Sequence, residues 1–240
     1  MTSPIVTLSS LKKPRFYLPL VPAFSAWLGH APFAFWLVEN HKPRLIVELG
    51  AHYGFSFLCF CQQVADMRLQ AECYAIDTWA GDEHAGFYGE EIFKNLNLFH
   101  NANYGSFSRL VRSKFNDAVH MFPDGSIDLL HIDGRHFYQD VKEDFETWLP
   151  KLSDRAVVLF HDTQVRQGNF GVYRLWNEVR QSYPHFEFLH AYGLGVLWVG
   201  SKRDDNCVSR YFTQLDVSNT SSIQVIYEFL GSLIGENKKV

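Results

Sequence analysis

The chain of 240 residues lacks a block of basic residues and a long uncharged run, and each absence excludes a class of protein. Lys and Arg number 22 against 26 Asp and Glu, so the chain lacks the positive surface that binding to nucleic acid requires. No stretch approaches the ~20 uncharged residues that span a bilayer. The N-terminal segment shows no apolar run followed by a small-residue cleavage site, so we expect no secretory signal and a cytoplasmic protein.

Cysteines are few, and their spacing argues against metal or redox chemistry. Cys59 and Cys61 are separated by one residue, whereas Cys73 and Cys207 stand far apart from them. A C-x-x-C pair is absent, which disfavours structural zinc and thioredoxin-like activity. We therefore expect four buried, reduced thiols.

Aromatic residues, in contrast, are abundant, with 21 Phe, 11 Tyr and 6 Trp. The hydrophobic fraction of 47% excludes disorder and is enough for one full α/β core. The aromatic excess indicates surface reserved for a ligand pocket or for a subunit interface such as that of a homodimer. Residues 1–40 contain an aromatic cluster that we expect to cap the main domain; its members are Phe24, Trp27, Phe33, Phe35 and Trp36.

Short apolar runs that end in an acidic residue recur along the chain. They cover residues 45–50, 73–78, 127–134 and 156–162. Continuous aliphatic runs of this length are typical of strands buried on both faces of a parallel sheet. Residues 55–67 and 137–149 have helical spacing between them, so the pattern predicts right-handed βαβ units and a Rossmann-like, doubly wound α/β fold over residues 41–200.

The last part of the chain departs from this alternation. Residues 186–190 and 196–199 flank a glycine-containing turn, which predicts an antiparallel hairpin that closes the sheet. Residues 201–240 form a C-terminal extension. We expect its first part, 201–221, to be polar and turn-rich, and the pattern of residues 223–234 predicts one helix.

Each predicted parallel strand ends near a carboxylate; these are Glu48, Asp77, Asp133 and Asp162. Ligands of open α/β sheets bind outside the carboxyl ends of the strands, so we expect the four side chains to converge on one crevice. The repulsion among them indicates a cationic ligand, a metal, or both.

The first turn narrows the nature of the ligand. Gly50 and Gly54 lie four residues apart, with His52 where a dinucleotide fingerprint requires glycine. A phosphate-free ligand with an adenosine half, such as S-adenosylmethionine, fits this turn better, with Asp77 binding the ribose. An NAD-dependent oxidoreductase remains the alternative from another enzyme class.

A second group of residues suggests catalysis. Asp133 and Asp162, with His161 as a third ligand, can share a divalent cation such as Mg²⁺. His136 is placed to act as a general base. The alternative is that His136 caps a helix and His161 is a core histidine.

Residues 78–91 combine glycines, aromatic residues and acids, which is typical of a binding loop. We interpret this loop as a substrate lid in which His84, Tyr88 and Glu90 contact a sugar-like acceptor. A solvated loop with a few anchoring aromatic residues is the competing interpretation.

Four stretches together resemble the class I S-adenosylmethionine-dependent methyltransferases. They are VELGAHYGFS, YAIDTWAGDEHAGFYGEE, the segment that contains I-D-G-x-H-x-Y and H-D-T, and the closing GLGVLWVG. The chain is most similar to a bacterial group with the I-D-G-x-H-x-Y and H-D-T motifs that is often linked to glycosyltransferases and polysaccharide assembly. The resemblance runs from about Trp27 to Gly200 and implies a seven-stranded sheet with a reversed last strand.

The resemblance also implies roles for individual residues. Cofactor contacts are implied for Glu48, Gly50, Gly54, Ser56, Asp77, Thr78, Trp79, Ser113 and Asp133. Related sugar O-methyltransferases hold magnesium at positions that correspond to Asp133 and Asp162 and use a histidine base, here His136. They usually have an acid where this chain has His161, so a metal-free site or a different divalent ion is the alternative to magnesium.

The sequence thus predicts an S-adenosylmethionine-dependent O-methyltransferase that acts on a hydroxyl of a sugar, polysaccharide or glycosylated small molecule. Asp133 and His136 would be its catalytic residues. The remaining alternative is a non-catalytic nucleotide-binding partner of a glycosyltransferase.

Overall fold

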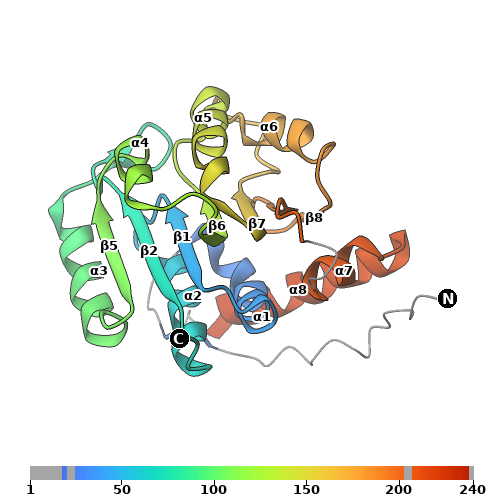
Figure 1. Ribbon diagram of the computed structural model, residues 1–240, viewed down its shortest axis with the longest axis horizontal. Helices are drawn as coiled ribbons and strands as arrows, with labels where there is room; N and C mark the ends of the chain where they lie inside the picture. The colour runs from blue at the N-terminus through green and yellow to red at the C-terminus, as the bar shows by residue number, and fades with distance from the viewer. Residues whose placement is uncertain (1–17, 21–24, 203–206, 238–240) are drawn as a thin grey trace.

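A seven-stranded sheet forms the centre of the computed structural model, which describes residues 18–20, 25–202 and 207–237 (Figure 1). The strand order is β5-β2-β1-β6-β7-β9-β8. The parallel strands are β1 (Leu45–Leu49), β2 (Glu72–Asp77), β5 (Ser108–Arg112), β6 (Ile127–Ile132) and β7 (Leu152–His161). The antiparallel strands β9 (Leu194–Trp198) and β8 (His185–Phe188) complete the sheet beside β7. The predicted Rossmann-like fold with a closing hairpin is confirmed.

Helices cover both faces of the sheet, as doubly wound folds require (Figure 1). One layer contains α1 (Ala31–His41), α2 (Phe55–Asp66), α7 (Cys207–Thr213) and α8 (Val217–Asn237), with the short helix η2 (Ala26–His30). The opposite layer contains α4 (Phe115–Ala118), η3 (Val119–Met121), α5 (Tyr138–Trp148), η4 (Leu149–Lys151) and α6 (Val172–Val179). Helix α3 (Glu90–Asn103) lies beside the edge strand β5.

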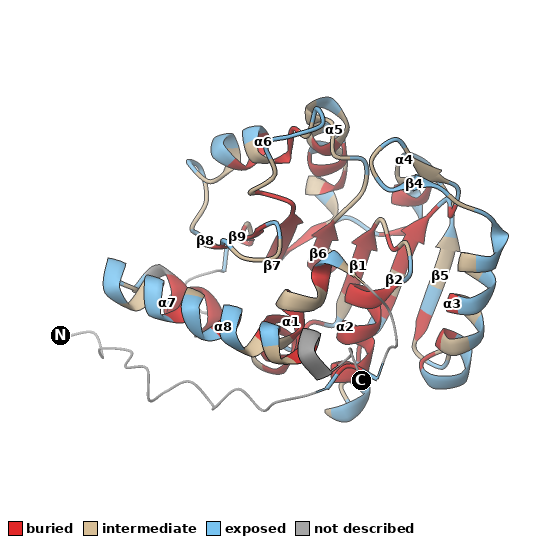
Figure 2. Cartoon of the chain, turned by 180° about the vertical axis from the view of Figure 1, so that it is seen from behind, coloured by how far each residue is buried: buried red, intermediate tan, exposed pale blue. Residues whose placement is uncertain are grey.

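Two hydrophobic clusters, one on each face, explain why the strand runs are apolar throughout. In β1, Ile46 belongs to the α1–α2 side, whereas Val47 and Leu49 belong to the α5 side. All six residues of β6 are buried, and the sheet is the most buried part of the molecule in Figure 2. Because side chains alternate across a strand, a strand covered on both faces needs apolar residues at consecutive positions.

Gly50 joins β1 to the cavity-lining turn, and its surroundings show why this position requires glycine. Its φ is +90°, and a Cβ at this position would come within 2.1 Å of the backbone oxygen of Asp133. The turn after β1 therefore packs directly on the end of β6, which brings two of the predicted site segments together.

Several elements differ from the sequence expectation. The segment expected to be turn-rich, 201–221, contains α7 and the start of α8, so that prediction was wrong. Short polar windows of this kind become helical through apolar packing, here of Tyr211 and Phe212 against Trp36. Strand β5 and helix α3 carried no clear periodicity and were not foreseen as elements, although the resemblance implied seven strands.

Other expectations concern single residues and segments. Cys59, Cys61 and Cys73 are buried and are not joined in disulfides, as predicted. Phe24 and parts of the N-terminal and C-terminal segments lie outside the described residues. Among the helices that are described, none is long and apolar enough to cross a membrane.

Candidate functional site

A cavity of about 1450 Å³ opens at the carboxyl ends of the parallel strands. Its walls come from η2, the β1–α2 turn, the segment after β2, the start of α4, the β6–α5 turn and the loop after β7. Asp77, Asp133 and Asp162 all line it, so three of the four predicted carboxylates converge. The volume is sufficient for a nucleoside-sized ligand and a second small molecule.

Asp77 supports the turn that follows β1. Its Oδ2 accepts hydrogen bonds from the backbone N–H groups of Ala51 and His52, each at 2.9 Å, and its Oδ1 accepts one from Trp79 at 2.8 Å. A pyrophosphate would need free N–H donors at this turn, and two of them are occupied by a carboxylate. This arrangement disfavours a dinucleotide and agrees with a ligand without phosphate.

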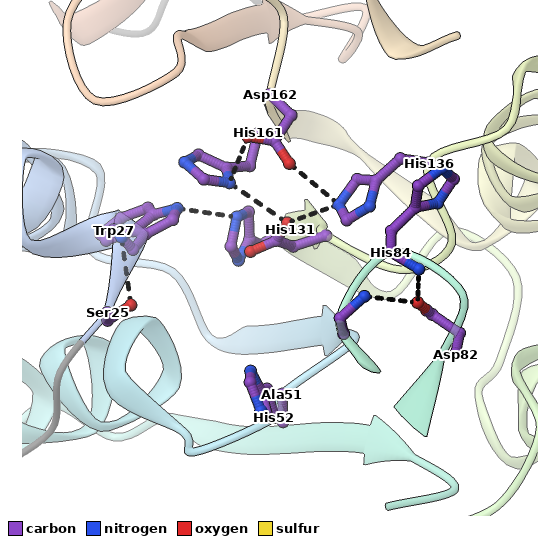
Figure 3. Close-up of polar contacts among 12 residues, drawn as sticks. Ser25, Trp27, Ala51, His52, Asp82, His84, His131, His136, His161 and Asp162 are labelled. Atoms are coloured by element: carbon purple, nitrogen blue, oxygen red, sulfur yellow. Dashed lines mark hydrogen bonds and ion pairs between the residues drawn. The ribbon is translucent and has the colours of Figure 1, made fainter. Parts of the chain in front are cut away.

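Two histidines face two carboxylates at the other end of the cavity (Figure 3). Nε2 of His136 lies 3.0 Å from Oδ2 of Asp162 and 3.4 Å from Oδ1 of Asp133. Nδ1 of His161 lies 3.2 Å from the same Asp133 oxygen and 3.4 Å from Oδ1 of Asp162. The charges of the acids and the imidazoles therefore stabilise one another within a few ångströms.

The pKa values of these groups follow from this pairing. Burial lowers the pKa of His161, but the charge and hydrogen bond of Asp133 outweigh it and raise the pKa to about 9. Burial would raise the pKa of Asp133, yet His161 and His136 hold it well below its usual value. The pKa of His136 is raised because Asp133 and Asp162 outweigh its burial. Nε2 of His161 faces the carbonyl oxygen of Ala191 at 3.2 Å and therefore donates to it.

One group of side chains has the spacing of a metal site. One ligand atom from each of Asp133, His136 and Asp162 lies within 4.8 Å of the others. The sequence led us to expect His161 in this set and His136 outside it. The structure thus assigns His136 to the group that has metal-ligand spacing.

Glu48 differs from the other three carboxylates because it does not line the cavity. It is fully buried, its Oε2 lies 2.7 Å from Nδ1 of His131, and Ser56 also donates to it. Burial raises the pKa of Glu48, against the opposing effect of His131. The side chain lies beneath the site rather than in it.

A small hairpin covers the cavity beside the histidines. Strands β3 (Gly81–Asp82) and β4 (Gly86–Phe87) form it, within the loop predicted to be a lid. The ring of His84 lies between those of Phe137 and Phe170, at centroid distances of 4.5 and 4.4 Å, and its Nε2 donates to the carbonyl of Gly168 at 2.9 Å. Glu83 forms an ion pair with Arg135 at 3.0 Å. These contacts attach the hairpin to both neighbouring loops.

The remaining predicted residues divide into two groups. Gly50, Ser56, Thr78, His84 and Tyr88 line the cavity. The residues that do not line it are Gly54, Trp79, Glu90 and Ser113. Glu90 pairs instead with Arg112 at 2.7 Å, and the hydroxyl of Ser113 donates to the carbonyl of Lys114.

Sequence reasoning missed several residues that line the cavity. They include Ser25, Phe115, Asp144, Phe170 and Tyr192. Asp144 belongs to the predicted helix at 137–149, whose pattern indicated packing alone, and the short helix that begins at Phe115 was not foreseen. Tyr192 has a φ of 69° in the β8–β9 turn, and Gly193 was the only sign in the sequence that this turn is tight.

Known proteins resemble this chain at several levels. Residues 47–163 match the sequence profile of a family described as "Methyltransferase domain". Uncharacterized protein y4gI of Sinorhizobium fredii is 55% identical over 192 residues, which cover 80% of this chain and 21% of that protein. The chain therefore spans about a fifth of the length of this curated relative.

Solved structures share the fold at low identity. A putative caffeoyl-CoA O-methyltransferase from Staphylococcus aureus has a TM-score of 0.54 and 16% identity, over 70% of this chain and 81% of its own. The O-methyltransferase TomG from Streptomyces achromogenes, in complex with S-adenosylmethionine, has a TM-score of 0.54 and 14% identity, over 74% and 82%. These similarities establish the methyltransferase-type fold.

Proposed function

Because residues 47–163 match a methyltransferase domain, we propose that the chain is an S-adenosylmethionine-dependent O-methyltransferase that acts on a hydroxyl of a sugar, polysaccharide or glycosylated small molecule. One observation carries the proposal. A single cavity contains both the β1–α2 turn, whose N–H groups bind Asp77 and so are not available to a phosphate, and the cluster of Asp133, His136 and Asp162. The turn fits an adenosine without phosphate, and the cluster fits proton transfer from a hydroxyl.

Asp77 would bind the ribose through one oxygen. A carboxylate offers about four lone-pair sites, and three are filled by backbone N–H groups. Oδ2 accepts two bonds and Oδ1 accepts one, so Oδ1 keeps a site for one ribose hydroxyl. Gly50 and Ser56 line the cavity next to this carboxylate and leave room for the amino-acid end of the cofactor.

His136 would take the proton of the acceptor hydroxyl. The hydroxyl oxygen attacks the methyl carbon, the carbon–sulfur bond breaks, and its electron pair stays on sulfur, so the positive charge of the sulfonium is lost. Asp133 and Asp162 stabilise the imidazolium that forms on His136, as the raised pKa of this histidine indicates. The cavity holds the two reactants together, which supplies the entropic part of the catalysis.

The donor set fits a divalent cation, although magnesium is not the best match. Two carboxylates and an imidazole suit manganese, iron or zinc, whereas Mg²⁺ prefers oxygen ligands alone. When held by Asp133, Asp162 and His161, with His136 left as the base, such an ion would act as a Lewis acid toward the acceptor oxygen. In the absence of an ion, the imidazolium of His161 neutralises the same carboxylates.

The residues of the lid favour the proposal that the acceptor is hydroxylated. Tyr88 stacks on His52 at a centroid distance of 4.8 Å, and Asp82, Glu91 and His84 line the cavity nearby. Aromatic faces and carboxylates of this kind suit a sugar ring. The staphylococcal and Streptomyces structures are described as O-methyltransferases, which supports oxygen as the acceptor atom.

Calorimetric titration with S-adenosylmethionine, with and without Mn²⁺ or Mg²⁺, tests the cofactor and the metal together. We expect binding of S-adenosylmethionine and none of NAD. Transfer of a labelled methyl group to a panel of mono- and oligosaccharides then tests the acceptor, and His136→Ala should lose transfer while it keeps cofactor affinity. Glu90→Ala, which alters a residue outside the cavity, is the matched control.

Three outcomes would contradict the proposal in different ways. Binding of NAD in place of S-adenosylmethionine would favour an oxidoreductase. Cofactor binding without any methyl transfer would favour a non-catalytic partner of a glycosyltransferase. Full activity of His136→Ala would reject His136 as the base.

A further inference from the structure

Asp144 is a buried carboxylate with no assigned role. It lies on α5, lines the cavity and is 7% exposed. Within residues 18–20, 25–202 and 207–237, no group donates a hydrogen bond to it and no cation pairs with it. A buried carboxylate that lacks partners is costly, so this group calls for a ligand that donates a hydrogen bond.

The surroundings of Asp144 define the shape of that ligand. A Cβ on Gly134 would come within 2.5 Å of the ring of Phe115 and 3.5 Å of Oδ2 of Asp144, so an aromatic ring, a bare backbone and a carboxylate meet at one place. Glu143 is occupied by Asn116 at 2.5 Å, and Asp140 pairs with Arg135 at 3.2 Å. A flat, apolar group with an N–H donor on its edge matches this part of the cavity.

The order of the strands places this corner at the adenine end. Asp162 follows β7 and Asp133 follows β6, where the methyl group would react, whereas Asp77 ends β2. Phe115 begins α4, which follows the outer strand β5 and contacts β2 and α5. A nucleoside that lies along this row puts its base between Phe115 and α5.

We propose that Asp144 accepts a hydrogen bond from the exocyclic amine of the cofactor's adenine and thereby selects adenine over hypoxanthine. The inference rests on the proposed function. Adenine presents an N–H donor at this edge, whereas hypoxanthine presents a carbonyl oxygen that a carboxylate repels. Ser113, which the sequence resemblance implied as a cofactor contact, does not line the cavity.

Titration with S-adenosylhomocysteine and with S-inosylhomocysteine tests the inference without any need for the acceptor. At pH 8 the wild-type protein should bind the adenine compound at least tenfold more tightly. Asp144→Leu, which keeps the branched shape and removes the acceptor, should lose this preference. Asp144→Asn should narrow or reverse it, because its amide N–H can donate to the hypoxanthine oxygen.

Asp140→Asn is the matched control, since Asp140 lies on the same helix and lines the same cavity. It should keep the wild-type preference. Equal binding of the two compounds by the wild-type protein, or an unchanged preference in Asp144→Leu, would overturn the inference. If Asp144→Leu does not fold, an unchanged preference in Asp144→Asn would do the same.

The proposed function and this inference fail in distinguishable ways. A wild-type protein that binds neither compound contradicts the proposed function, and the inference falls with it. A wild-type protein that binds both equally leaves the proposed function standing and rejects the role of Asp144.

Discussion

The indole N–H of Trp27 donates a hydrogen bond to Nε2 of His131 at 3.2 Å, across 104 residues of sequence. An indole N–H can only donate, so Nε2 of His131 accepts and the ring proton is on Nδ1. That Nδ1–H donates to Oε2 of Glu48 at 2.7 Å. All three side chains are buried, and together they join η2 to β6 and β1. Figure 3 shows the contact between Trp27 and His131.

Replacement of Trp27 by Phe should therefore destabilise the protein by more than its loss of volume explains. Nε2 of His131 would be left buried without a partner, which costs about 1–3 kcal/mol. Trp198→Phe is the control, because Nε1 of Trp198 has no partner among the described residues and the ring is equally buried. Urea unfolding of both variants measures the difference. Equal losses of unfolding free energy would show that the hydrogen bond contributes nothing.

His41 should make stability depend on pH below neutrality. It is buried beside the carbonyl oxygen of Asp128, and burial lowers its pKa to about 4. The unfolded chain binds this proton below about pH 6.5, whereas the folded protein resists it until about pH 4, so stability is lost as the pH falls through this window. The loss should approach about 3 kcal/mol. His41→Gln should flatten the pH profile of the unfolding free energy; an unaltered slope would contradict this assignment.

Asp144 should have the opposite pH dependence. Burial, with Asp140 and Glu143 nearby, raises its pKa to about 7. The folded protein therefore holds this proton from about pH 4 to pH 7 while the unfolded chain has lost it, so stability falls as the pH rises through that window. Asp144→Asn should raise the melting temperature by several degrees at pH 8 and leave it nearly unchanged at pH 4. If Asp144→Asn is no more stable than the wild-type protein at pH 8, the charged form of Asp144 does not destabilise the fold.

The lid should depend on Gly81. Its φ is +77°, and a Cβ would come within 2.0 Å of the carbonyl oxygen of Gly86, so Gly81→Ala should open the β3–β4 hairpin. Cleavage by a nonspecific protease within residues 81–87 should accelerate at least tenfold, with little change in global unfolding, because the hairpin lies outside both core clusters. Gly89→Ala is the control, because no atom of the described residues lies within 4 Å of a Cβ at that position. Identical cleavage rates would show that the hairpin does not depend on this glycine.

Much of the fold could be predicted because its signals are local. The apolar runs at 45–50 and 127–134 indicate strands covered on both faces, since no other element keeps consecutive residues buried over so short a length. The carboxylates at the strand ends then indicate one crevice, because parallel strands end at the same edge of a sheet. Asp77, Asp133 and Asp162 lie there, as this reasoning predicts.

The lengths of α7 and α8 could not be predicted, because their windows are polar and become helical by packing against distant aromatic residues such as Phe33. For the same reason the sequence did not distinguish His136 from His161 as a neighbour of the carboxylates. His136 follows β6 and His161 ends β7, and only the fold shows that both imidazoles face Asp162.

The sequence by itself determined the parallel sheet, its reversed last strands and the edge at which the chemistry is expected, because strand burial and strand polarity follow from neighbouring residues. Only the tertiary structure decided that Glu48 is withdrawn beneath the cavity by His131 and that Asp144 enters it with no partner in the described part of the chain. The physical reason is that a side chain's partner, and hence its charge and its role, depends on residues brought close from far along the chain.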